Sequence, residues 1–135
     1  MVASPAVSQQ KQGEPAPAQL ESRWPGHFPK VACPPADARA LSDSVYRIAD
    51  TWESFLEQER AKGCRAASLS CYLALEDALA ARALHDYWND VPVVCATLST
   101  EHGVIKQTGQ SPKHHSVWLT RAALAEAPAL FKAAT

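Results

Sequence analysis

The chain has 135 residues, of which 47% are hydrophobic and 20% are charged, and its formal net charge is −1. A length in this range indicates one domain. The near-neutral charge excludes a general nucleic-acid binder of the usual kind, because such a protein carries an excess of basic residues over its whole chain. The uncharged runs Ala66–Leu75 and Val91–Thr100 have ten residues each, too few to cross a bilayer as a helix.

Residues 1–36 are expected to form a disordered or extended arm. Seven of the ten prolines lie here, among Ala, Gln and Ser and without apolar periodicity. Trp24, His27 and Phe28 stand between prolines that favour extended backbone. Two alternatives remain open for these side chains: they pack back onto the domain, or they dock into a groove of a partner.

The first part of the domain is predicted to be an antiparallel helical hairpin. Over residues 37–63, apolar side chains recur every three or four positions, at Leu41, Val45, Ile48, Trp52, Phe55 and Leu56. Residues 65–89 are rich in Ala and Leu, the strongest helix formers. The short link at Gly63 predicts that the two helices pack side by side. A homodimer through this hairpin is one option.

The last third of the chain changes to β-branched apolar runs. Val93–Leu98 and Val104–Thr108 are separated by a turn that contains Gly103, which predicts a β-hairpin. Ser116–Leu119 is expected to be a third strand. The predicted fold is therefore α+β: a single domain over residues 37–135, with a helical hairpin packed on a small antiparallel sheet of two or three strands.

A final helix is expected after the third strand. Thr120 is a favourable N-cap residue, and the helix would run through Ala127. Pro128 is expected to kink or interrupt it. Leu124, Leu130 and Phe131 would then face the interior.

The four cysteines are expected to be reduced thiols of an intracellular, cytoplasmic protein. Their intervals are 31, 7 and 24 residues, and the chain has no CxxC pair, which argues against a zinc finger. The first ten residues lack the basic start and apolar middle of a secretory signal. A domain of this size builds a core without disulfides, so reduced cysteines are the simpler expectation.

One group of residues supports an alternative function, either a small thiol enzyme or a zinc-binding protein centred on Cys95. If the predicted strands pair, Cys95, His102, His114 and His115 approach one another. A thiolate beside an imidazole is the minimum for a small thiol enzyme, and the same side chains are zinc ligands. Their spacing matches neither motif.

Charge is distributed unevenly along the chain. Residues 37–90 hold ten acidic and six basic side chains, a net −4, whereas residues 103–135 hold four basic and one acidic, a net +3. Lys106, Lys113, His114 and His115 thus predict a mildly basic face that contacts a partner. Weak nucleic-acid binding through this face is a further alternative.

The sequence favours a non-enzymatic protein-binding module: an adaptor, an inhibitor or a subunit of a larger complex. It has no glycine-rich phosphate loop, since its five glycines are isolated, and no GxSxG elbow. No catalytic residue, cofactor, metal or membrane contact is predicted. The residues expected to contact a protein partner are Trp24, His27, Phe28, Lys106, Lys113, His114 and His115.

Overall fold

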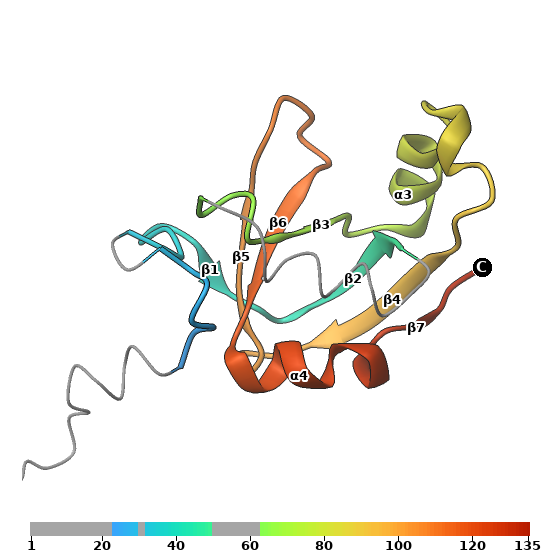
Figure 1. Cartoon of the computed structure of the whole chain (residues 1–135). Helices are drawn as coiled ribbons and strands as arrows, with labels where there is room; N and C mark the ends of the chain where they lie inside the picture. Colours follow the sequence, from blue (N-terminus) through green and yellow to red (C-terminus); the bar gives the residue numbers. More distant parts are fainter. Residues whose placement is uncertain (1–22, 30–31, 50–62) are drawn as a thin grey trace, which may run out of the picture.

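The computed structural model describes residues 23–29, 32–49 and 63–135, and these residues form two antiparallel β-sheets with short helices (Figure 1). The strands described are β1 (Arg39–Ala40), β2 (Asp43–Ile48), β3 (Leu69–Cys71), β4 (Val93–Leu98), β5 (Gly103–Gln107), β6 (His115–Leu119) and β7 (Lys132–Ala133). The helices are α3 (Leu75–Arg82) and α4 (Arg121–Leu130), and a short 3₁₀ turn, η2, spans Asp86–Trp88.

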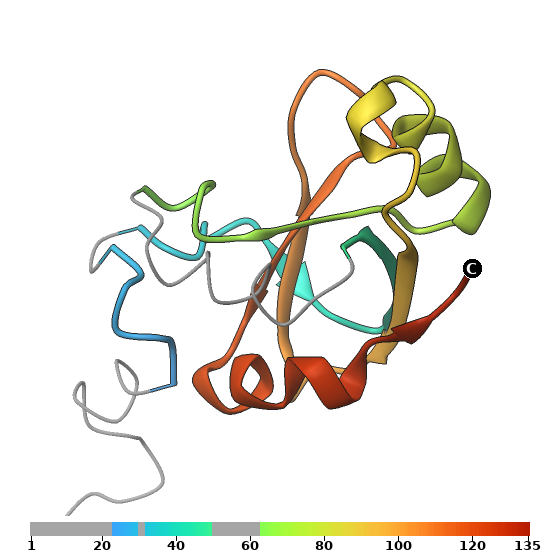
Figure 2. The same ribbon diagram turned by 45° about the vertical axis from the view of Figure 1, so that its right-hand side comes forward.

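The strands of the two sheets are interleaved along the sequence. One sheet has the strand order β1-β5-β6-β3, and the other has the order β2-β4-β7. The two views place α4 below the sheets and α3 with η2 at the upper right (Figures 1 and 2). The β5–β6 hairpin keeps a continuous register from Gly103 opposite Leu119 to Gln107 opposite His115.

The core lies between the sheets and is closed by α4. In the longer strands alternate side chains face inward, as the two-residue period of a strand requires. Inward residues include Val45, Ala96 and Leu98 from one sheet, and Leu69, Cys71, Ile105, Val117 and Leu119 from the other. Helix α4 adds Ala123 and Ala127 to the same cluster, and Phe131, directly after the helix, completes it.

At the end of the chain, the predicted third strand and the N-cap of the last helix are confirmed, whereas the helix continues past Ala127 and the strand β7 was not predicted. The expected third strand is β6, and the Thr120 side chain caps α4 by accepting a hydrogen bond of 3.2 Å from the backbone N–H of Ala123. Pro128 lies inside the helix, which continues to Leu130. Proline has no backbone N–H, so Pro128 donates no hydrogen bond within the last turns of α4.

The prediction of a helix over residues 37–63 is wrong for the part that the structure describes. Residues 39–40 and 43–48 are strands, while residues 50–62 lie outside the described residues. The misleading signal was the interval of four between Leu41 and Val45. Side chains four positions apart share a face in a strand as well as in a helix, because four is even and also close to 3.6.

The predicted second helix over residues 65–89 is also wrong over much of its length. Its start contains β3, in which Leu69 and Cys71 are buried and Ser70 is exposed, and only Leu75–Arg82 is α-helical. The chain is therefore mostly β, without a helical hairpin in its described part. The homodimer expected through that hairpin loses its basis.

The strands expected at 93–98 and 104–108 exist, but their pairing was predicted wrongly. Strand β4 pairs with β2 and β7, while β5 pairs with β1 and β6. The turn before Gly103 therefore carries the chain from one sheet to the other. Gly103 has φ +149°, and a Cβ there would overlap the Trp118 carbonyl oxygen on β6, so both its conformation and its contact favour glycine.

The expectation of four reduced thiols is wrong as well. Cys33 and Cys64 form a disulfide across a sequence separation of 31, whereas Cys71 and Cys95 are free. Disulfides persist in oxidising compartments, so the cysteines no longer support the expected cytoplasmic location. Among the described residues, no helix is long and apolar enough to span a membrane.

Candidate functional site

The aromatic residues of the N-terminal arm lie against the domain, with Phe28 buried and Trp24 and His27 half-buried. Phe28 is 5% exposed and belongs to a cluster with Trp118 and Ala67, on the face of the sheet that points away from the main core. Trp24 stacks on Phe28 with ring centroids 6.0 Å apart, and the His27 ring meets Phe28 edge-on at 5.0 Å. This arrangement is the packing alternative, and it leaves Phe28 unavailable as a docking side chain.

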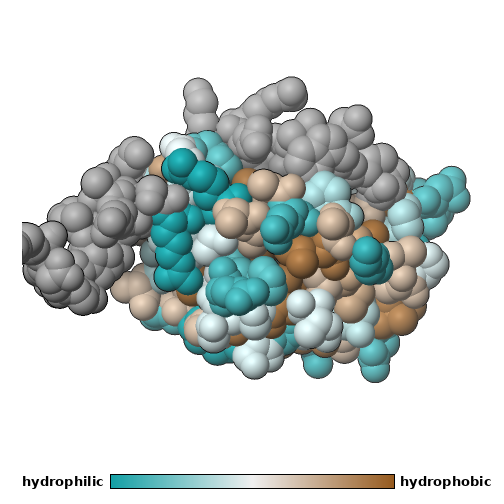
Figure 3. All heavy atoms as spheres, turned by 90° about the horizontal axis from the view of Figure 1, so that it is seen from below, coloured by the Kyte–Doolittle hydropathy of each residue, from teal (hydrophilic) through white to brown (hydrophobic). Residues whose placement is uncertain are grey.

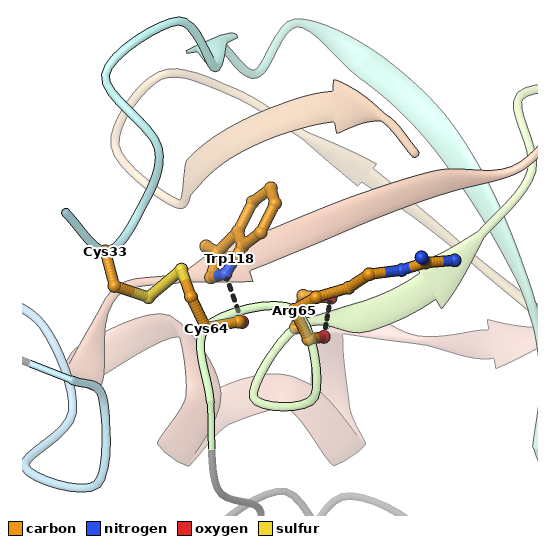
Figure 4. Close-up of a disulfide and its surroundings, with 5 residues drawn as sticks. Cys33, Cys64, Arg65 and Trp118 are labelled. Atoms are coloured by element: carbon orange, nitrogen blue, oxygen red, sulfur yellow. Dashed lines mark hydrogen bonds between the residues drawn. A yellow bond between two sulfur atoms is a disulfide. The ribbon is translucent and has the colours of Figure 1, made fainter. Parts of the chain in front are cut away.

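The disulfide holds this second aromatic layer in place (Figure 4). Cys33 and Cys64 pack beside the cluster, and the indole N–H of Trp118 donates a 2.8 Å hydrogen bond to the Cys64 carbonyl oxygen. The Arg65 side chain extends away from the disulfide. The disulfide therefore joins the segment at Cys64 to the segment at Cys33, and the indole contact joins it to β6.

The predicted basic face is largely engaged within the protein. The Lys106 ammonium lies 2.7 Å from the Asp37 carboxylate, and the Lys113 ammonium lies 4.0 Å from Asp77. His115 Nδ1 contacts the Lys113 carbonyl oxygen at 3.2 Å. Much of the positive charge is therefore already matched by acidic side chains, which weakens this face as an anionic-partner site.

His114 takes part in a polar network at the base of the β5–β6 loop. Its Nδ1 lies 3.1 Å from the Thr108 carbonyl oxygen, so the ring donates there, and the Thr108 and Ser116 hydroxyls are 2.7 Å apart. The Tyr72 ring meets the imidazole edge-on at 5.8 Å. Burial lowers the pKa of His114, and the nearby Arg65 charge lowers it further.

The predicted cluster of Cys95 with three histidines does not assemble. Cys95 lies opposite Tyr46 in the β2–β4 pair, whereas His115 lies on β6 of the other sheet, opposite Gln107 and Cys71. His102 belongs to the turn before β5, where its Nδ1 accepts a 2.9 Å hydrogen bond from the Ser99 N–H.

The Cys95 thiol lies beside the hydroxyl group of Tyr46. The Cys95 sulfur raises the pKa of the Tyr46 hydroxyl through charge and a hydrogen bond. In the described ranges, no three His, Cys, Asp or Glu side chains are grouped so that they could hold a metal ion.

Sequence reasoning missed the most exposed apolar feature of the described chain, the aromatic loop Leu84–Trp88. Leu84 is 77% exposed and Tyr87 is 72% exposed. The His85 ring lies 5.1 Å from the Tyr87 ring and 4.7 Å from the Trp88 ring, and the Tyr87 and Trp88 rings are 5.4 Å apart. The loop lies beyond α3, at the upper right of Figure 1, away from α4.

Backbone hydrogen bonds connect successive residues of the aromatic loop. The His85 N–H donates to the Arg82 carbonyl, the Trp88 N–H to the His85 carbonyl, and the Val91 N–H to the Trp88 carbonyl, at 3.3, 3.0 and 3.0 Å. The Arg82 guanidinium closes the base of the loop through a 2.9 Å bond to the Val91 carbonyl oxygen. The rings are thus presented on a preorganised turn.

The surroundings of the aromatic loop are acidic. Residues 75–90 contain four acidic side chains, Glu76, Asp77, Asp86 and Asp90, and one basic side chain, Arg82, a net charge of −3. The sequence signal that could have located this feature is the run Tyr87-Trp88-Asn89-Asp90 before Pro92, where the helix predicted over residues 65–89 ends.

Comparison with known proteins found no match: neither a protein-family model nor a curated protein nor a solved structure is similar to this chain.

Proposed function

We propose that the chain is a non-enzymatic protein-binding module and that the aromatic loop Leu84–Trp88 is its principal contact with the partner. One observation carries this proposal: two large apolar side chains, Leu84 and Tyr87, stand more than 70% exposed on a hydrogen-bonded turn. Isolated exposed apolar residues are ordinary, but Tyr and Trp side chains grouped on one hydrogen-bonded turn are typical of interface hot spots.

The charge around the loop defines the kind of partner. The net charge of −3 over residues 75–90 favours a protein whose apolar pocket is rimmed by Lys and Arg. The preorganised turn supports binding because little conformational entropy is lost on association. The partner-binding role expected for Trp24 and Phe28 is not part of this proposal, since Phe28 is buried against Trp118.

The test is native mass spectrometry of the chain isolated under mild conditions from its own source. The wild-type chain should carry a macromolecular partner, and the double variant Leu84→Ala with Tyr87→Ala should lose it. Both side chains are mostly exposed, so the free energy of unfolding should change by less than about 0.5 kcal/mol.

Glu126→Ala is a matched control, because Glu126 is exposed on α4 at a distance from the aromatic loop. This variant should retain the partner. A double variant that is stable and still binds the partner as tightly as the wild type would contradict the proposal.

A further inference from the structure

Residues 23–29 and 32–38 of the described chain, which we call the strap, lie against the face of the β5–β6 hairpin that points away from the main core. The strap occupies the left of Figure 1, and seen from below hydrophilic side chains gather on that side of the molecule (Figure 3). Its buried contacts with the sheet are apolar: Phe28 packs with Trp118, which is only 1% exposed. The other strap side chains packed against this cluster are Trp24, Cys33 and Ala38. An apolar layer therefore lies between the strap and the sheet.

This apolar layer is separate from the main core. Val104 lies opposite Trp118 in the β5–β6 register, and both belong to the layer under the strap. The next pair along the two strands, Ile105 and Val117, faces the main core. Among the described residues the main-core cluster begins at Leu41, so the strap contributes no side chain to it. Detachment of the strap would therefore uncover Trp118 and leave the main core closed.

The strap buries little of its own length. Of its described residues, only Pro25 and Phe28 are buried. Ordering a chain segment costs conformational entropy at every residue, and two buried side chains offset that cost only in part. The polar contacts of the strap with the rest of the protein lie at the surface and include Arg121 N–H to the Arg23 carbonyl oxygen at 2.9 Å, the Arg121 guanidinium to the Trp24 carbonyl oxygen at 3.1 Å, and Lys106 to Asp37 at 2.7 Å. The strap therefore depends on its covalent link to the domain.

The Cys33–Cys64 disulfide is that covalent link (Figure 4). Both cysteines are only half-buried, and the residue before each of them is exposed, so a small dithiol can reach the bond. Ala32, directly before Cys33, has φ +59°, a left-handed conformation that is unfavourable for a residue with a Cβ. Such a conformation persists only where the surrounding structure holds it, and the disulfide is the covalent restraint beside it. Cleavage of the bond lets Ala32 relax, which favours an open strap.

We propose that the Cys33–Cys64 disulfide is a redox switch that controls whether the strap covers Trp118. A dithiol reductant attacks one sulfur, forms a mixed disulfide and then closes its own disulfide. The two cysteines thereby accept two electrons and two protons and become thiols, while the dithiol is oxidised. The strap then detaches and exposes the apolar face at Val104 and Trp118, while both sheets stay folded. An oxidising compartment keeps this face covered and a reducing one uncovers it. The switch is independent of the aromatic loop and of the function proposed for it.

The experiment is NMR spectroscopy of the full chain, first oxidised and then reduced with excess dithiothreitol. In the oxidised chain, nuclear Overhauser effects should connect the Phe28 ring with the Trp118 indole, and reduction should abolish them. The Arg121 amide signal should shift as well, because its hydrogen bond to the strap is lost. The cross-strand effects between β2 and β4, such as those of Val45 opposite Ala96, should persist. Reoxidation should restore the original spectrum.

Two variants separate the disulfide from other effects of the reductant. Cys33→Ser with Cys64→Ser should give the open spectrum without any reductant. Cys95→Ser, which removes a free thiol on another strand, should respond to dithiothreitol as the wild type does. Contacts between Phe28 and Trp118 that survive reduction would overturn the proposal. So would loss of the β2–β4 contacts together with those of the strap, because the reduced chain would then be unfolded rather than opened.

Discussion

Removal of the Cys33–Cys64 disulfide should destabilise the fold by a large share of its total free energy of unfolding. The bond closes a loop across a sequence separation of 31. The chain-entropy relation for a loop of this length gives about 3–4 kcal/mol at 25 °C. Domains of this size are stable by only about 5–15 kcal/mol.

The disulfide also restrains the segment that covers Trp118. Cys64 accepts the Trp118 indole hydrogen bond, and both cysteines border the cluster of Phe28, Ala67 and Trp118. The part of the fold that the disulfide stabilises therefore contains tryptophan side chains, and their fluorescence reports on unfolding.

Urea unfolding followed by tryptophan fluorescence measures this effect. The double variant Cys33→Ser with Cys64→Ser, and the wild type treated with dithiothreitol, should both lose about 3–4 kcal/mol. Cys95→Ser, which removes a free and half-buried thiol, is the control and should lose much less. If reduced and oxidised wild type unfold at the same urea concentration, the disulfide does not stabilise this fold and the reasoning is refuted.

Three further predictions follow from burial. Phe28→Ala should cost about 3–4 kcal/mol in urea unfolding because Phe28 is only 5% exposed, and an unchanged midpoint would show that segment 23–29 does not pack on the domain. Burial lowers the pKa of His114 below its ordinary 6.5, so the unfolded chain takes up a proton more readily. The free energy of unfolding should therefore decrease as the pH falls below about 6.5, and it should decrease less in His114→Gln. Equal pH dependence in the wild type and this variant would contradict the prediction. Burial raises the pKa of the Cys71 thiol to about 12, so mass spectrometry after brief alkylation at pH 8 should find Cys95 modified and Cys71 intact, and equal modification would contradict the core assignment.

The sequence predicted local structure well where the local pattern admits one interpretation. Val93–Leu98 is rich in β-branched residues, Ser116–Leu119 contains Val117 and Trp118, and both segments are strands. Thr120 caps α4 as expected, because N-cap chemistry depends only on residues three positions away.

The pairing of the strands could not be predicted in the same way. Strand β4 lies beside β2, whose Val45 is 51 positions before Ala96, and no local pattern encodes that partner. The interval from Leu41 to Val45 suits both periods, and the helical interpretation of it removed β2 from consideration. The error in fold class followed from that ambiguity together with the prediction of one helix over the Ala- and Leu-rich residues 65–89.

The candidate site was missed for a related reason. Tyr87 and Trp88 were assigned to the apolar stripe of a helix, and periodicity does not distinguish a buried stripe from an exposed turn. The contacts of Phe28, Cys33 and Cys64 were missed because these residues are far apart in sequence and meet only around Trp118. Such long-range contacts appear only once the chain is folded.

The most direct test of the proposed binding role is site-specific photo-crosslinking in the source cells. A photoreactive phenylalanine derivative replaces Tyr87 in one chain and the exposed Ala125 of α4 in a second chain. Position 87 should give one discrete crosslinked product with a basic protein, and excess wild-type chain should abolish it whereas the Leu84→Ala, Tyr87→Ala variant should not. A product that forms equally from position 125, or one that the double variant displaces as well as the wild type does, would contradict the assignment of the aromatic loop as the docking surface.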